Sequence, residues 1–292
     1  LEDGIAEDGD TGADLIPPRD FDMAKFYRGR QFFRDNLFSC CISMFYALIL
    51  GLCFPDFLKT LIFTNNSETP RKAHKRYIST FKHIASWHYG DVWKEGSEAQ
   101  KSILAVRKMH EKIRSEMAKN GCDHYLSQYN MVLVQSAFFA FPLMNTQQFG
   151  IQCSNASLDD YVYFWYGIGH LLGIDAKYNV CSRGMAQAKY FCENIRDEVV
   201  IPNLKNPSED FYKMSNAIIV GWNRYLHNTV SVPYVIAFFL KLTNGESKRL
   251  GFVDMIRSIF WRLIFAAVRN MLSFKKFFNV AIERQFGLSF SK

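Results

Sequence analysis

The feature that most constrains the fold of this chain is the spacing of its apolar residues, which recur every three or four positions along almost the whole sequence. This spacing places apolar side chains on one face of an α-helix, whereas a half-buried strand alternates apolar and polar residues. No convincing alternating segment and no internal repeat can be identified. The pattern therefore predicts an all-α protein.

Helix start signals divide this pattern into segments. Thr69-Pro70 is an N-cap followed by proline at the first helical position. The segments 97–100 and 157–160 are typical of capping boxes, and the segment 206–209 opens a further helix. Together with the apolar spacing, these signals predict helices over residues 22–36, 37–53, 70–90, 97–119, 123–142, 157–173, 183–197, 209–225, 229–243 and 250–285.

The chain is expected to form a single helical domain with two extensions. Residues 1–20 are acidic, contain Gly residues and Pro17-Pro18, and are expected to form a flexible arm. No linker long enough to separate two domains lies within residues 21–245, which we assign to the helical domain. Residues 246–292 are expected to form a basic amphipathic helical tail.

The most apolar segment runs from Leu37 to Phe54, with no charged residue in eighteen positions, and Pro55 follows it. Its length is close to that of a transmembrane span, but its small polar residues also suit packing inside a protein. We expect a buried or membrane-dipping helix here.

Seven cysteines at irregular spacing form neither a disulfide framework nor a zinc motif, which indicates free thiols. A Cys181–Cys192 pair stays open as an alternative. Two glycosylation triplets begin at Asn65 and Asn155. The cellular compartment is therefore left open among the endoplasmic reticulum or another membrane, secretion and the cytoplasm.

The positive charge lies in the tail. The formal net charge is +7, and residues 241–292 hold ten Lys and Arg against three acids, which accounts for the whole excess. These bases lie among aromatic and aliphatic residues without a nucleic-acid-binding signature, so nucleic acid is not an expected partner. Arg262, Arg269 and Lys276 recur every seven residues, which indicates a helix at a membrane surface or a docked helix with a solvated basic face.

His110 is the most informative residue of the predicted helix 97–119, because it falls within the apolar stripe of that helix. Arg107 and Arg114 flank it at three and four residues. Burial disfavours a charged imidazole, and a neutral imidazole is the form that binds iron or zinc. No zinc motif surrounds it. A histidine in such a stripe can also be a packed core residue, and the spacing alone does not separate the two interpretations.

The predicted helix 70–90 presents Arg76, Thr80, His83 and Trp87 on one face. A buried arginine requires an anion, and this face offers no acidic residue. A haem propionate would supply that anion, with the Thr80 hydroxyl as a further donor. An Arg76 side chain that reaches solvent is the alternative.

Three segments together resemble the rubber oxygenase family, which includes latex clearing proteins and the endoplasmic-reticulum-bound oxygenases of mycophenolic acid synthesis. The first is Arg76-Tyr-Ile-Ser-Thr80, and the second, thirty residues later, is Val106-Arg-Lys-Met-His110-x-x-x-Arg114. The third is Trp165-Tyr-Gly-Ile-Gly-His170-Leu-Leu-Gly173-Ile. The resemblance covers roughly residues 22–230.

The resemblance implies a helical fold with a globin-like core and a b-type haem whose iron is held by the residue at the position of His110. It places Arg76 and Thr80 beside the haem, where we treat them as candidate catalytic and binding residues. Arg107, Arg114 and His83 are further candidates for contact with the cofactor. Rubber-cleaving members use dioxygen to cut carbon–carbon double bonds of polyisoprenoids.

Two positions depart from the rubber-cleaving members. Ser79 stands where those enzymes have a lysine that approaches the iron, and Thr60 stands where they have a carboxylate base. Both departures count against polyisoprene cleavage and leave haem binding unaffected. His83 and His88 are candidates for the remaining iron position.

Three hypotheses follow. The first is a haem-dependent oxygenase acting on an apolar, isoprenoid or lipid-like small molecule; an aromatic content of 16%, with 27 Phe, suits such a ligand. The second is a carrier of haem or of a hydrophobic ligand that shares the fold without catalysis. The third is a membrane-associated helical protein without a cofactor.

Overall fold

The computed structural model describes residues 2–122, 124–243, 245 and 249–288, and every regular element within these ranges is helical. This confirms the predicted all-α class. In chain order the elements are η1 (Glu2–Ile5), α1 (Met23–Asp35), α2 (Leu37–Gly51), α3 (Pro55–Thr64), α4 (Pro70–Tyr89), α5 (Glu98–Ala118), α6 (Gln128–Met144), α7 (Asn155–Leu171), η2 (Val180–Arg183), α8 (Met185–Ile195), the π-helix η3 (Arg196–Val200), α9 (Ile201–Lys205), α10 (Glu209–Leu226), α11 (Val232–Leu242), α12 (Phe252–Asn270) and α13 (Leu272–Phe286).

Three of the four predicted helix starts have the expected caps. The side chains of Thr69, Ser97 and Ser208 each accept a hydrogen bond from the backbone N–H three residues later. The fourth was wrong: α7 begins after Ser154, whose hydroxyl accepts from Ser157 N. Asp160 therefore lies inside α7 and forms an ion pair with Arg28 of α1 (2.7 Å) instead of capping the helix.

Two predicted boundaries also differ from the structure. Pro55, which follows the apolar segment, is the first residue of α3, a helix absent from the predicted set, and its missing N–H costs nothing at that position. The predicted helix 250–285 is divided at Met271, whose extended backbone separates α12 from α13. The proposed domain bounds at residues 20 and 245 stay predictions.

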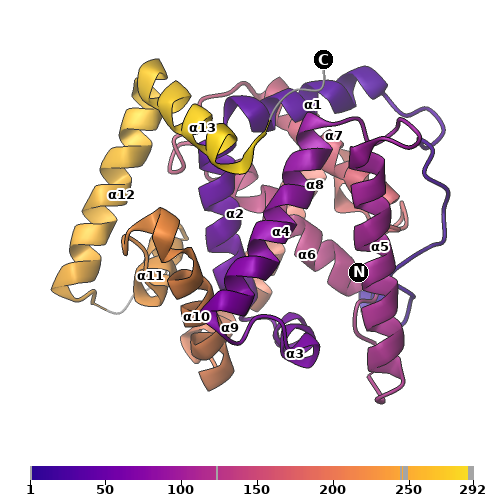
Figure 1. The fold of residues 1–292 in the computed structure, drawn as a ribbon, viewed down its shortest axis with the longest axis horizontal. Coiled ribbons are helices and arrows are strands. Elements are labelled where there is room, and N and C mark those ends of the chain that lie inside the picture. Colours follow the sequence, from indigo (N-terminus) through magenta and orange to yellow (C-terminus); the bar gives the residue numbers. More distant parts are fainter. Residues whose placement is uncertain (1, 123, 244, 246–248, 289–292) are drawn as a thin grey trace.

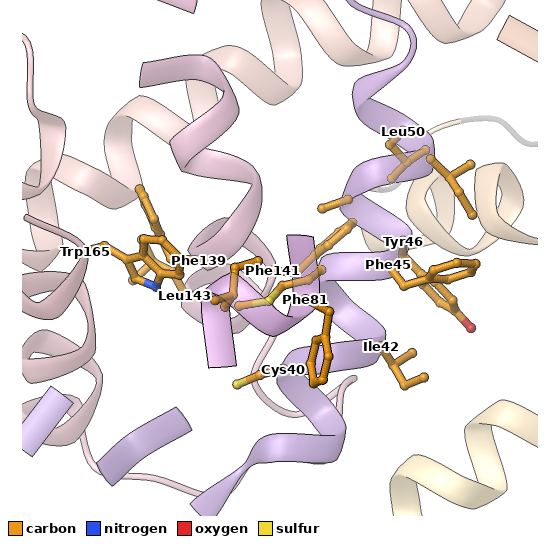
Figure 2. Packing of buried hydrophobic residues seen from close by; sticks show 14 of the residues in the cluster. Cys40, Ile42, Phe45, Tyr46, Leu50, Phe81, Phe139, Phe141, Leu143 and Trp165 are labelled. Atoms are coloured by element: carbon orange, nitrogen blue, oxygen red, sulfur yellow. The ribbon is translucent and has the colours of Figure 1, made fainter. Parts of the chain in front are cut away.

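The core is built around α2, as Figure 2 shows. Helix α2 packs against α6, and in Figure 2 Phe139 and Phe141 of α6 lie on one side of α2 while Phe45 and Tyr46 extend from its other side. Most of the Leu37–Gly51 helix is buried within the protein, which explains its apolar composition. All seven cysteines are free thiols.

No single helix among the described residues is long and apolar enough to cross a membrane. Helices α1 and α2 meet those criteria only together, with a bend of 88° between them.

Helix α1 crosses α7 closely and also holds the end of α4. A Cβ added to Gly29 would lie 2.1 Å from the carbonyl oxygen of Asp160, so only glycine allows this approach. Arg30 and Arg34 of α1 both donate to the carbonyl oxygen of His88 (3.1 and 2.9 Å). Positive side chains at the C-terminus of a helix satisfy free carbonyls and the helix dipole. These bonds fix the end of α4.

His88 is fully buried, so it gives the fold a pH dependence. Its ring stacks on Phe33 (3.8 Å between centroids), its Nδ1 hydrogen-bonds Ile84 O, and its Nε2 has no hydrogen-bond partner in the described part of the chain. Burial is the main cause that lowers its pKa well below 6.5. The folded protein therefore keeps His88 neutral while the unfolded chain takes up a proton below about pH 6.5.

Stability contributed by the neutral His88 is thus complete above pH 6.5 and is lost as the pH falls below it. We expect His88→Phe to reduce the loss of unfolding free energy between pH 7 and pH 5 by about 2 kcal/mol. Urea unfolding of both proteins at the two pH values measures this. An equal loss in both proteins would contradict it.

Candidate active site

The predicted face of α4 lies against α5, the helix at the opposite edge of the molecule from α12 (Figure 1). His83 Nδ1 hydrogen-bonds the hydroxyl of Ser102 on α5 (2.7 Å), and Trp87 Nε1 donates to the same oxygen (3.0 Å). Ser102 therefore joins the two helices. It also holds the His83 ring, whose pKa burial lowers.

Arg76 lies farther along the same face of α4, where it is partly buried. Its guanidinium donates to the hydroxyl of Thr64, at the end of α3 (2.7 Å). Within the described ranges no carboxylate lies at ion-pair distance from Arg76. Glu68, whose charge raises the pKa of Arg76, pairs with Lys72 instead (3.1 Å). Burial lowers the pKa of Arg76, although a guanidinium remains charged at neutral pH. Arg76 is thus a desolvated cation in need of an anion.

His110 of α5 is close enough to Arg76 for the two charges to interact. Its ring Nδ1 is inaccessible to solvent and forms no hydrogen bond with any described residue. Burial, together with the positive charges of Arg114 and Arg76, lowers the pKa of His110 to about 4, against a smaller opposing effect of Asp10. The ring is therefore neutral at physiological pH, which is the state that binds a metal ion.

The other positions on α3 and α4 offer little acid–base chemistry. Thr80 donates from its hydroxyl to Arg76 O one turn earlier (3.2 Å), and Ser79 is exposed. The Thr60 hydroxyl is buried and donates to Asp56 O in its own helix (2.8 Å). Neither Ser79 nor Thr60 can take the place of a lysine or of a carboxylate base. His88 is enclosed by Phe33, and its ring is not available as a ligand.

Arg107 and Arg114 are engaged by the N-terminal arm. Arg107 forms a bidentate ion pair with Asp10 and donates to Ala13 O (2.7 Å). Arg114 pairs with Asp8 (2.9 Å). Burial by itself raises the pKa of Asp10, but the hydrogen bonds from Arg107 and the Gly12 amide, together with the charges of Arg107 and Arg114, outweigh it and leave that pKa below 3.8. These two arginines therefore already have anionic partners, unlike Arg76.

The arm is also fixed on its other side, by α6 and the end of α7. Gln128 donates from its side chain to Asp8 O and to Gly173 O (2.9 and 3.0 Å), and Thr11 N donates to Gly173 O (3.0 Å). Farther along the arm, His170 of α7 hydrogen-bonds Ile16 O (3.0 Å). The arm thus runs beside α5 (Figure 1).

Replacing Asp10 tests whether this ion pair holds the arm. In Asp10→Asn the half-buried Arg107 loses its charged partner, at a cost of about 1–3 kcal/mol. We expect the Thr11 amide hydrogen to exchange at least ~5-fold faster. Asp14→Asn is the matched control, because Asp14 is an exposed acid of the same arm. Equal exchange rates in Asp10→Asn and the wild type would contradict the role of the pair.

Two cavities differ in character. An open cavity of about 470 Å³ lies between the arm and α5, and charged residues such as Asp10, Arg107 and Glu111 line it. A smaller apolar cavity of about 70 Å³ is lined mainly by α2, α6 and α8, including Leu50, Phe141 and Cys192. His110 lines neither cavity.

The structure thus joins His83 of α4 to α5 through Ser102 and places His110 within electrostatic range of Arg76, whereas Thr80 bonds within α4 and Arg107 and Arg114 are engaged by the arm. Sequence reasoning missed four partners. Asp8 and Asp10 could have been found from the excess of acids in the arm, and Ser102 from its position two turns before His110 on the same helix. No signal pointed to Thr64.

Comparison with known proteins shows the family to which the chain belongs. A sequence profile described as "ER-bound oxygenase mpaB/B'/Rubber oxygenase, catalytic domain" matches residues 30–275. A solved structure titled "Structure of Latex Clearing Protein LCP in the closed state" is similar in fold, with a TM-score of 0.56 and 16% identity over 95% of this chain and 77% of that one. No curated protein matches the sequence. The match over most of the chain shows that this protein belongs to the family of ER-bound mpaB/B' and rubber oxygenases.

Proposed function

We propose that this chain is a haem b-dependent oxygenase that acts with dioxygen on an apolar, isoprenoid or lipid-like substrate. Family membership supports the oxygenase role. The observation that carries the haem assignment is that His110 and Arg76 lie within electrostatic range of each other and that both need a further partner. Among the described residues, the Nδ1 of the neutral His110 imidazole is buried without a hydrogen-bond partner, and the desolvated Arg76 guanidinium has no carboxylate at ion-pair distance.

These two residues suit two groups of a haem, the iron and a propionate. A neutral imidazole serves as an axial ligand of haem iron, and a guanidinium pairs with a propionate. His110 would hold the iron and Arg76 a propionate, and the bound haem would supply the iron that activates dioxygen. The Thr80 hydroxyl donates to Arg76 O within α4, and Ser102 holds His83 in place. Arg107 and Arg114 fit the propionate role less well because Asp10 and Asp8 occupy them.

The chain's own residues limit what protein groups can contribute to the reaction. Ser79 is exposed, and the Thr60 hydroxyl is bonded to Asp56 O in its own helix, so neither residue offers a base. Proton transfer would therefore depend on other groups. This favours a second candidate function, a haem or hydrophobic-ligand carrier with the same fold. The oxygenase and a haem carrier both require the haem and differ in turnover, whereas a carrier of a hydrophobic ligand does not require it.

Absorption spectroscopy after haem supplementation tests the proposal first. We expect a Soret band that survives gel filtration with the protein; its absence would overturn the oxygenase and the haem carrier. Oxygen uptake with a panel of isoprenoids then separates them. Substrate-dependent uptake supports the oxygenase, whereas stable haem without uptake supports the carrier.

A further inference from the structure

The outward face of α12 is apolar although it lies at the surface of the protein. Phe252, Ile256, Ile259 and Leu263 are spaced three or four residues apart and are 42% to 73% exposed together with their neighbour Phe260. At 100° per residue they form one stripe along the helix. Figure 1 shows α12 at the edge of the molecule, where a flat surface can reach it.

The opposite side of α12 is the one that packs on the protein. Trp261, Phe265 and Val268 are buried, and Trp261 donates from its indole nitrogen to Thr229 O (2.9 Å). The helix is therefore apolar on both sides, and its docking on α11 accounts for only one of them. A contiguous exposed apolar stripe marks an interaction surface.

Helix α13, which follows the break at Met271, also carries exposed apolar residues, including two phenylalanines. Leu272 and Phe277 are 64% and 67% exposed, and Phe274 is 40% exposed. Helix α13 is held to the body through Asn279, which accepts from Phe38 N (3.0 Å), and through Glu283, which accepts from Tyr89 (2.8 Å). The exposed apolar residues of α12 and α13 thus belong to a firmly attached part of the protein.

The charge around this surface is positive. Between residues 249 and 288 the two acids are engaged internally, Asp254 with Arg257 (2.6 Å) and Glu283 with Tyr89. The exposed charged residues there are all basic: Arg249, Arg262, Arg269, Lys276 and Arg284. By helical spacing, Arg262 and Arg269 lie along one margin of the apolar stripe.

We propose that the outward face of α12 and the start of α13 dock this protein on a lipid bilayer that carries anionic headgroups. An apolar stripe with phenylalanines, bordered by arginines, is the pattern of a helix that lies in the plane of a membrane interface. The arginine stems can follow the apolar surface while their guanidiniums reach the headgroups. A second copy of the chain fits less well, because it would bring the same cations together.

Vesicle flotation of the full chain tests this proposal. We expect the protein to float with phosphatidylcholine vesicles that contain phosphatidylserine and to float less with phosphatidylcholine alone. In Arg262→Gln/Arg269→Gln the partition onto anionic vesicles should fall about 30-fold, since each base near such a surface contributes about a fivefold effect. In Ile256→Glu/Leu263→Glu it should fall at least ~30-fold on both kinds of vesicle.

Val220→Glu is the matched control, because Val220 is 53% exposed on α10, away from this surface. It should float like the wild type, and all variants should unfold at similar temperatures because the altered side chains are exposed. Failure of the wild type to float with anionic vesicles would overturn the proposal, and so would unchanged flotation of Ile256→Glu/Leu263→Glu. A wild-type dimer without vesicles, dissociated by the glutamates, would instead make this face an interface between copies.

Discussion

His110→Ala is expected to abolish stable haem binding. Alanine removes the neutral imidazole whose pKa is lowered in part by the charge of Arg76, and the two other candidate histidines are engaged elsewhere. His83 is bonded to Ser102, and His88 is enclosed by the core. Loss of the axial ligand should weaken haem affinity at least ~100-fold, since even the loss of a group that only orients a metal ligand costs 10–100-fold.

Titration of haem into the apoprotein, followed at the Soret band, measures this effect. His124→Ala is the matched control, because His124 is exposed and should leave the titration unchanged. Thermal unfolding of the apoprotein separates ligand loss from misfolding: His110 makes no hydrogen bond with a described residue, so its removal should cost little stability. Unchanged haem affinity in His110→Ala would refute the assignment.

Most helices could be predicted because their signals are local. The apolar spacing and caps such as Ser97 depend on residues within one or two turns, so they can be read before any tertiary contact is known. The errors occurred where one local signal had two meanings. Pro55 ends one helix and begins the next, and Ser154 and Ser157 both suit an N-cap.

The candidate site was predictable only in part. The face formed by Arg76, Thr80 and His83 follows from helical spacing, and the structure places it against α5. That Arg107 pairs with Asp10 could not be predicted, because ninety-seven residues separate the two and only the tertiary fold brings them together. The same holds for Arg76 and Thr64, since the helix that ends at Thr64 was not recognised.

The second large effect is expected from Gly29→Ala, at the crossing of α1 and α7. The new methyl group would lie 2.1 Å from Asp160 O and 2.7 Å from Phe164 Cβ, and backbone cannot yield as a flexible side chain can. The helices must separate, which also strains the ion pairs Arg28–Asp160 and Lys25–Asp159. We expect a loss of about 3 kcal/mol of unfolding free energy, measured by urea unfolding.

Gly51→Ala provides the matched control for this substitution. Its methyl group would meet Phe57 at an ordinary 3.6 Å, and alanine favours the helix by up to about 1 kcal/mol over glycine, so the variant should be as stable as the wild type or slightly more so. Equal stability of the two variants would show that the crossing adapts. A destabilised Gly29→Ala should also bind haem less tightly, because α1 holds the end of α4 through Arg30 and Arg34, and α4 carries Arg76.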